Sequence, residues 1–336
     1  MKLITLVMLI LLAPSQIPDE PQLVKSDLAN LAIGKPITYK NLTIFPLTRR
    51  FTPKTEYVTL DEAMKKDWLT IREIGGGEVN FVELRNSGNK VVFIMTGEMI
   101  SGAKQDRMLK DDVLIPPKSE WLRVPVYCVE HGRWVTVSPA FKSSELMVPN
   151  ALRQRARISE NQSEVWDEIA ASQDRLGIVS RTGTAMANYE DEDTRKEIAE
   201  YTERFADMPK LAENTVGVCV TTGSRIICVD IFANNTLLMK YWNKLLKSYV
   251  MDAIHETKSN IHKAEIQGLL DALAHAHCVS TGTPGLGDLL EIETDFGKGS
   301  VLIHKANLVH MDFFPSDVFA DPQWRLDMRR DQRLND

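Results

Sequence analysis

The pattern of apolar and polar residues along the first half of the chain predicts a series of short strands. Turn-forming residues separate the apolar runs, as at residues 86–89. One helix is expected among them, because Thr59 and Glu62 have the spacing of a capping box, and this helix would end near Lys66. The predicted strands cover residues 37–39, 42–47, 81–84, 91–95, 113–115 and 122–129.

Apolar residues in the second half recur at spacings of three and four, which predicts helices with one face in the core. Helices are expected at residues 143–176, 191–205 and 236–276, and strands at 289–292 and 300–304. The sequence therefore predicts an α+β fold. Its N-terminal half is expected to be strand-rich, as a β-sandwich or barrel, and its C-terminal half to be helical with returning hairpins.

The N-terminus has the pattern of a cleaved signal peptide. Lys2 precedes an apolar run over residues 3–12, and Ala13 and Ser15 place small residues at the positions that a signal peptidase reads. The pattern predicts a leader over residues 1–15 and an exported chain, periplasmic or extracellular. The alternative is a buried N-terminal strand or helix. The run is about half of the ~20 residues that span a bilayer, so no stable membrane span is expected after cleavage.

The composition is that of a globular protein and argues against one class of partner. The chain has 336 residues, of which 43% are hydrophobic and 26% are charged, which excludes a mostly disordered chain. There are 40 Lys and Arg against 46 Asp and Glu, so the net charge is -6. Because nucleic-acid binding relies on clustered basic residues, no nucleic-acid partner is expected. The sequence identifies no protein partner.

The four cysteines include no CxxC pair, which argues against a zinc ribbon or a thioredoxin-type site. Cys219 and Cys228 lie in residues 216–231, a predicted hairpin that turns at Gly223 and Ser224. Counting outward from this turn pairs Cys219 with Cys228 in a non-hydrogen-bonded position, close enough for a disulfide. The hairpin thus predicts either a Cys219–Cys228 bridge or two half-buried thiols.

Polar side chains gather in two segments, residues 97–107 and 126–134, each next to a predicted buried strand. Arg107 and its neighbours offer donors for an anion, and the carboxylates in these segments could activate water as general bases. The candidate bases are Glu98 and Glu130. The candidate ligand-binding residues are Lys104, Gln105, Arg107, Arg133 and Trp134. All of them except Trp134 are expected to meet at one sheet edge, where they form either an anion site or a structural ion-pair network.

These segments also carry a resemblance to a known family. The motifs Gly102-Ala-Lys-Gln-Asp-Arg107 and Cys128-Val-Glu130 with Gly132-Arg-Trp134 resemble those of the ARG and rhodanese-phosphatase-superfamily-associated protein domain family. Asp106 stands where this family usually has Asn. The resemblance implies a link to nucleotide or ADP-ribose chemistry and no particular reaction. Further matching segments are Phe45-Pro46-Leu47, Thr59-Leu-Asp-Glu-Ala63, Gly97-Glu98 and Val229-Asp-Ile-Phe232.

The resemblance also divides the chain. Residues 30–256 are expected to form the family's α+β domain, 257–325 a C-terminal extension that packs on it, and 326–336 a polar tail.

No metal site and no cofactor are predicted. His275, His277 and Cys278 are potential ligands, but His275 and His277 do not share a helix face, and no carboxylate stands at ligand spacing. Two functions remain. The first is a binding or scaffold module with an anion site, for a nucleotide-like or ADP-ribose-like ligand. The second is a hydrolase of a phosphate- or ribose-bearing substrate with a glutamate base. The sequence leaves open whether the protein is an enzyme.

Overall fold

An antiparallel sheet built from both ends of the chain organises the structure, a computed structural model that describes residues 20–210 and 214–316. The predicted leader, residues 1–15, and the polar tail, 326–336, lie outside the described residues, so the leader and export stay predictions. Among the described helices, none is long and apolar enough to cross a membrane.

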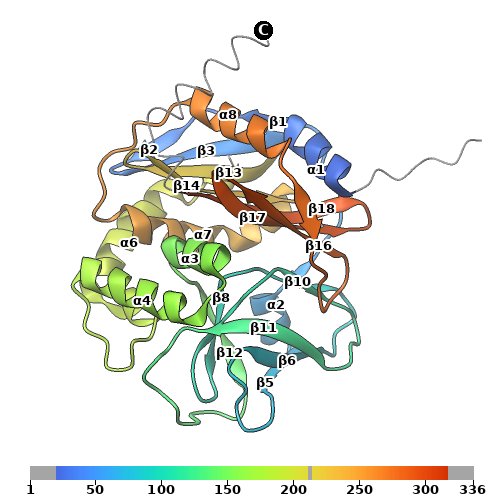
Figure 1. The fold of residues 1–336 in the computed structure, drawn as a ribbon, viewed down its shortest axis with the longest axis vertical. Helices are drawn as coiled ribbons and strands as arrows, with labels where there is room; N and C mark the ends of the chain where they lie inside the picture. Colours follow the sequence, from blue (N-terminus) through green and yellow to red (C-terminus); the bar gives the residue numbers. More distant parts are fainter. Residues whose placement is uncertain (1–19, 211–213, 317–336) are drawn as a thin grey trace, which may run out of the picture.

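The largest sheet has nine strands in the order β1-β3-β13-β14-β18-β17-β16-β15, with β2 paired to β3 (Figure 1). Its strands are β1 (Leu31–Ile33), β2 (Ile37–Tyr39), β3 (Leu42–Arg49), β13 (Thr215–Thr222), β14 (Arg225–Phe232), β15 (Cys278–Ser280), β16 (Asp288–Thr294), β17 (Gly297–His304) and β18 (Asn307–Pro315). The central strands are buried on both faces, because other elements cover each side.

Two smaller sheets lie at the other end of the molecule, seen at the bottom of Figure 1. The six-stranded sheet runs β12-β8-β9-β11-β6-β5, and the three-stranded sheet runs β10-β7-β4. Their strands are β4 (Val58–Thr59), β5 (Leu69–Glu73), β6 (Phe81–Asn86), β7 (Val92–Ile94), β8 (Glu98–Gly102), β9 (Arg107–Leu109), β10 (Val113–Ile115), β11 (Leu122–Cys128) and β12 (Phe141–Met147).

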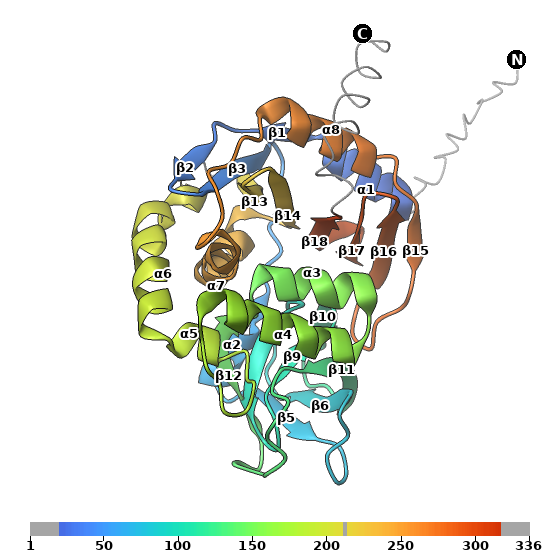
Figure 2. The same ribbon diagram turned by 60° about the vertical axis from the view of Figure 1, so that its left-hand side comes forward.

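Helices form two layers around the large sheet (Figures 1 and 2). One face is covered by α1 and α8, and the other by α3 and α7, with α4 and α6 farther out. The helices are α1 (Glu20–Ala29), α2 (Leu60–Lys65), α3 (Asn150–Ser159), α4 (Gln162–Leu176), α5 (Ala187–Glu190), α6 (Glu192–Phe205), α7 (Asn235–Ala253) and α8 (Lys263–Leu273), with a 3₁₀ turn at Met208–Lys210.

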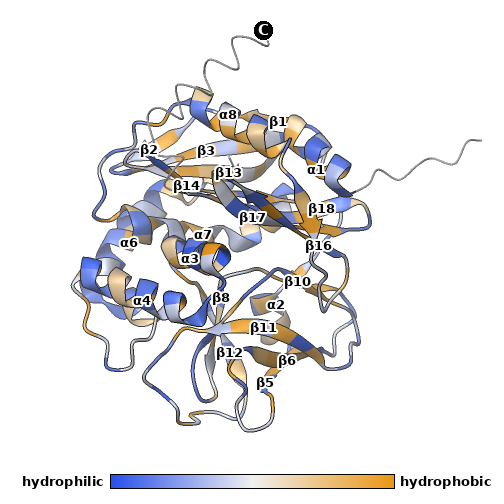
Figure 3. Cartoon of the chain, viewed as in Figure 1, coloured by the Kyte–Doolittle hydropathy of each residue, from blue (hydrophilic) through white to orange (hydrophobic). Residues whose placement is uncertain are grey.

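Three hydrophobic cores fill the spaces between these layers. The first lies between the large sheet, the helices around α7 and the smaller sheets, the second lies under α1 and α8, and the third lies within the smaller sheets. Figure 3 shows hydrophilic residues prevailing on the outlying helices α4 and α6. The predicted stripe of 236–276 belongs to the first core through Tyr241, Trp242 and Leu245 of α7.

Several local predictions are confirmed. The Thr59 hydroxyl accepts from the backbone N–H of Glu62 and the Glu62 carboxylate accepts from that of Thr59, so the predicted capping box begins α2. Asp191 caps α6 through the backbone N–H of Thr194, at the start of the predicted helix 191–205. The hairpin of residues 216–231 is formed by β13 and β14. These features depend on neighbours in the sequence, which is why the sequence shows them.

The predicted division into a strand-rich half and a helical half is wrong. Strands occur along the whole described chain, and the C-terminal half supplies six of the nine strands of the large sheet. Residues 143–147 belong to β12, and residues 236–276 are broken into α7 and α8. The strand β18 was not predicted, because His310 and Asp312 interrupt its apolar pattern.

The predicted pairing of Cys219 with Cys228 is also wrong. A bulge between Val220 and Thr221 shifts the register, so that Cys228 lies opposite Val220 and Cys219 opposite Val229. A shift of one residue turns a side chain to the other face of the sheet. The two thiols therefore belong to different cores, and both are free.

A buried network of charged side chains joins the large sheet to α3. Arg153 of α3 forms a bidentate pair with Asp230 of β14, at 3.1 Å and 2.6 Å. One turn later, Arg157 contacts Asp312 of β18 at 3.4 Å and donates to the Ser300 hydroxyl of β17 at 3.0 Å. The sheet register places Asp230, Asp312 and Ser300 side by side across three strands. Both arginines are buried, so these ion pairs fix the helix against the sheet.

His310 extends this network to the loop before β10. Its Nδ1 lies 2.6 Å from Oδ2 of Asp112, and its Nε2 lies 3.3 Å from Oδ1 of Asp230. Both ring nitrogens therefore face carboxylates and donate to them, which requires the charged imidazolium. Burial opposes this charge, but the two carboxylates outweigh burial and raise the pKa of His310 to about 9.

Replacing His310 by Gln should flatten the pH dependence of the unfolding free energy on the alkaline side. The pKa of the folded state lies above the ordinary value of about 6.5, so the charged ring stabilises the fold fully below that pH. The contribution, on the order of 3 kcal/mol, is lost as the pH rises through about 9. Urea unfolding of the wild type and the variant near pH 6 and above pH 9 measures the difference.

The matched control is His275→Gln, which removes an exposed imidazole beyond the end of α8. This variant should show the same slope of unfolding free energy against pH as the wild type. Equal slopes for His310→Gln and the wild type would show that the ring is neutral in the folded protein.

Candidate functional site

The structure brings together four of the polar residues predicted to meet, at the turn between β8 and β9 and the end of β11. They are Gln105, Arg107, Glu130 and Arg133. Asp106 and Cys128 lie among them. The Gln105 amide donates to the carbonyl of Glu130 at 2.7 Å, and its Oε1 lies 3.1 Å from the Cys128 sulfur. This group of six is called the β9–β11 cluster below.

Most charges of the β9–β11 cluster pair with one another. Arg133 lies 2.5 Å from Oε2 of Glu130 and 3.0 Å from Oδ1 of Asp106, and it also donates to the Ala103 carbonyl at 2.9 Å. Burial favours the neutral form of Glu130, but the hydrogen bonds from Arg133 and Thr182 outweigh burial and lower its pKa. Such mutual pairing is typical of a structural network.

Arg107 is fully buried and differs from the rest of the cluster. Its Nη1 donates to the carbonyl of Gln105 at 3.0 Å and lies 3.5 Å from the Cys128 sulfur. Within the described residues, its Nε and Nη2 have no hydrogen-bond partner. Burial lowers the pKa of Arg107 and raises that of Cys128. The guanidinium nevertheless stays charged at neutral pH.

Glu98 lies in a separate network. One oxygen accepts from Nζ of Lys244 on α7 at 2.5 Å, and the other accepts from the backbone N–H of Met95 at 2.8 Å and from the Tyr241 hydroxyl at 3.3 Å. Burial raises the pKa of Glu98, although Lys244 acts against this shift. The predicted meeting of Glu98 with Arg107 and Glu130 is therefore wrong.

Lys104 and Trp134 lie outside the β9–β11 cluster. The Lys104 ammonium stands 5.0 Å from the centre of the Trp134 ring, a cation–π contact, and it also donates to the Gly76 carbonyl. The Trp134 side chain is half exposed. A pocket of about 290 Å³ lies nearby and is lined by His131, Trp166 and Gln173 among others, but the predicted ligand-binding residues do not line it.

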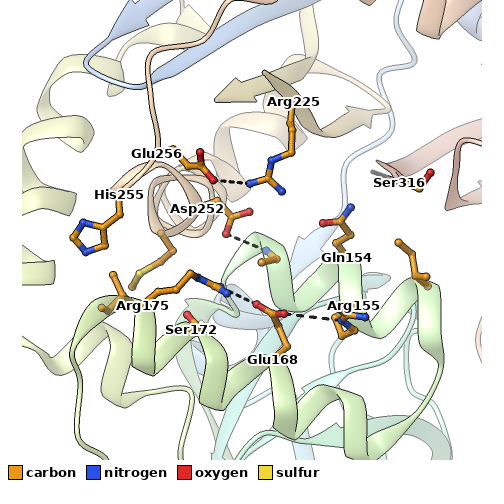
Figure 4. Close-up of a pocket in the computed structure, with 14 residues that line it drawn as sticks. Gln154, Arg155, Glu168, Ser172, Arg175, Arg225, Asp252, His255, Glu256 and Ser316 are labelled. Atoms are coloured by element: carbon orange, nitrogen blue, oxygen red, sulfur yellow. Dashed lines mark hydrogen bonds and ion pairs between the residues drawn. The ribbon is translucent and has the colours of Figure 1, made fainter. Parts of the chain in front are cut away.

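A larger pocket opens between α3, α4, β14 and the end of α7 (Figure 4). Its volume is about 420 Å³. Three arginines from three different elements line it: Arg155 of α3, Arg175 of α4 and Arg225 of β14. The other polar lining residues include Gln154, Glu168, Ser172, Asp252, His255, Glu256 and Ser316. We call it the arginine pocket.

Each arginine of the arginine pocket has a carboxylate partner and remains partly exposed. Arg175 donates to Glu168 at 2.8 Å, and Arg225 donates to Glu256 at 2.8 Å. Arg155 donates to Glu164 at 3.2 Å and lies 4.0 Å from Glu168. The exposed fractions of the three arginine side chains are 54%, 39% and 47% for Arg175, Arg225 and Arg155. Because a guanidinium has five N–H donors and exposed ion pairs are weak, these groups can also bind a ligand.

Asp252 is a titratable group of this pocket, and it forms no ion pair with any residue that the structure describes. Its carboxylate accepts from the backbone N–H of Ala151 and from the Asn150 amide, both at 3.1 Å. Pro149, the N-cap of α3, makes no side-chain capping bond, so Asp252 satisfies the first turn of that helix from α7. Burial raises the pKa of Asp252 to about 6, because its effect outweighs that of these hydrogen bonds, which lower the pKa.

Sequence reasoning missed the arginine pocket. Its arginines are separated by 20 and 50 residues, and each looks like part of a solvated surface in the sequence. The one available signal was weak: His255 and Glu256 follow Asp252 by three and four residues, just past the end of α7.

The described residues contain no group of three or more His, Cys, Asp or Glu side chains that could hold a metal ion. Cys278 begins β15, while His275 and His277 precede it beyond the end of α8.

Comparison with known proteins gives one match. The family model described as the ARG and Rhodanese-Phosphatase-superfamily-associated Protein domain matches residues 30–314. The match confirms the resemblance and extends through β18, beyond residue 256. No curated protein and no solved structure matches the chain.

Two substitutions of Arg107 should separate the role of its bulk from that of its charge. Arg107→Ala leaves a cavity in the core and should cost about 2–5 kcal/mol of unfolding free energy. Arg107→Met should recover most of this loss, because it refills the space and orphans no carboxylate in direct contact. Urea unfolding measures both values. If Met proves as costly as Ala, the charge and its hydrogen bonds stabilise the site.

Proposed function

The chain belongs to the family of the ARG and Rhodanese-Phosphatase-superfamily-associated Protein domain, and we propose that within this fold the arginine pocket binds a small phosphate-bearing ligand. One observation carries the proposal: three guanidinium groups from three separate elements line one pocket of about 420 Å³. Guanidinium binds phosphate through two parallel hydrogen bonds, which gives both affinity and orientation. The family name links the chain to no particular reaction, so the pocket supplies the argument.

The rest of the lining favours a phosphorylated sugar over a nucleotide base. Glu168, Glu256 and Gln154 offer oxygen acceptors for hydroxyl groups. The described lining residues include no Phe, Tyr or Trp on which a base could stack. A ligand of the ADP-ribose type would accordingly be held through its phosphates and riboses.

The β9–β11 cluster supports ligand binding less well, because Arg133, Glu130 and Asp106 already pair with one another. The hydrolase alternative with Glu98 or Glu130 as base also has less support. Both oxygens of Glu98 are engaged by Lys244, Tyr241 and the backbone. Neither glutamate lines the arginine pocket.

Ribose 5-phosphate, glucose 6-phosphate and ADP-ribose should be tested by thermal shift and calorimetry, with ribose as the phosphate-free control. We expect a phosphorylated compound to raise the melting temperature and ribose to have no effect. Arg175→Ala should weaken binding about 10- to 100-fold, because it removes charge-assisted hydrogen bonds.

Arg195→Ala is the matched control, since it removes an exposed arginine of α6 that does not line the pocket. Its affinity should equal that of the wild type. An equal loss in both variants, or no binding of any phosphorylated compound, would refute the proposal.

A further inference from the structure

The charges that line the arginine pocket nearly cancel when Asp252 is ionised. Arg155, Arg175 and Arg225 then face three carboxylates, those of Glu168, Glu256 and Asp252. An anion would enter such a site without a net attraction, and the one carboxylate without a counter-ion would repel it. A proton on Asp252 removes this repulsion and leaves the lining with one net positive charge.

Asp252 differs from the other two carboxylates in its partners. Glu168 and Glu256 each bind an arginine of the pocket, as the dashed lines of Figure 4 show. Asp252 forms no ion pair within the described part of the chain, and its hydrogen bonds come from Asn150 and Ala151 of α3. Both of these partners are donors, so they leave room for a proton on the outer lone pair of either oxygen.

We propose that the pocket takes up one proton together with its anionic ligand, and that Asp252 holds this proton and donates it in a hydrogen bond to an oxygen of the ligand. The inference rests on the proposed function and adds a residue and a ligand class to it. The ligand would be an oxyanion, because the protonated carboxyl group needs an oxygen acceptor beside the guanidinium groups.

Charged and titratable groups from several elements surround Asp252. Just past the end of α7, His255 and Glu256 line the same pocket, and Arg225 of β14 faces it. Glu168 and Arg175 come from α4, and Arg155 comes from α3. Tyr189 of α5 and Cys228 of β14 interact electrostatically with Asp252, but burial raises the pKa of both far above neutrality. The arginines stay charged throughout.

The size of the expected effect follows from the titration of Asp252. Its pKa is raised to about 6 by burial, so the carboxyl is mostly protonated at pH 5 and about one part in 30 is protonated at pH 7.5. If only the protonated form binds the anion, the apparent dissociation constant rises about 30-fold between these two pH values.

Sulfate is a suitable probe, because it keeps two negative charges over this range whereas phosphate itself titrates. Its dissociation constant would be measured from the melting temperature against sulfate concentration at pH 5 and 7.5, with ionic strength held constant by chloride. Sulfate also stabilises proteins nonspecifically. The variant Arg175→Ala lacks one guanidinium of the pocket. The change in its melting temperature with sulfate is therefore subtracted as the background.

Comparing the wild type with two variants shows which residue holds the proton. The wild type should lose affinity about 30-fold from pH 5 to 7.5, and Asp252→Asn should bind with nearly equal affinity at both. His255→Gln should keep the dependence of the wild type. A flat wild type, or a dependence that survives in Asp252→Asn and vanishes in His255→Gln, would overturn the inference.

A measurement on the wild type avoids the risk that Asp252→Asn fails to fold. The enthalpy of sulfate binding in two buffers of different ionisation enthalpy gives the number of protons taken up. We expect a value near one at pH 7.5, falling towards zero at pH 5. Sulfate binding without proton uptake would refute the inference alone. No sulfate binding above the Arg175→Ala background at either pH would refute the proposed function, and the inference with it.

Discussion

The ion network between α3 and the large sheet is the constraint on which the rest of the structure depends. Charged groups that leave water must find partners, and here each buried arginine of α3 finds a carboxylate on a sheet strand. Arg153 and Arg157 are one helical turn apart, while Asp230 and Asp312 lie side by side on β14 and β18. The register of the sheet and the rotation of the helix are thus fixed together. His310 carries the same constraint to the loop that connects the two smaller sheets, between β9 and β10.

The position of α3 in turn shapes the arginine pocket. The face of α3 that carries Arg153 and Arg157 is held against the sheet, so Ala151 and Arg155 line the pocket on another face. Asp252 of α7 caps the free N–H of Ala151, which ties the two helices together at the pocket wall. One carboxylate therefore has a structural role and also faces the space where a ligand would sit. Its protonation costs little in structure, because a neutral carboxyl can still accept both hydrogen bonds.

The sequence predicted those parts of the fold that depend on local contacts. The capping box at Thr59 and the hairpin of β13 and β14 are set by residues close in sequence, and both were found. The register of that hairpin was not predicted, because the bulge between Val220 and Thr221 shifts the pairing by one residue, and counting outward from the turn does not reveal a bulge. The strand β18 was hidden for a related reason. Its polar residues look like surface positions until the arginines of α3, about 150 residues away, are placed beside them.

The candidate site was only partly predictable, because some of its residues contact elements that are distant in the sequence. The four residues of the β9–β11 cluster that the sequence grouped lie in two short segments, and pairing of β9 with β11 brings these segments together. Glu98 is on the same segment as Arg107, yet the approach of Lys244 from α7 places it in another network. Density of charged residues in the sequence is thus a poor guide to ligand binding, because dense charges tend to satisfy one another. The arginines of the arginine pocket are far apart in the sequence. Their guanidinium groups keep exposed donors because they come from elements that the fold holds apart.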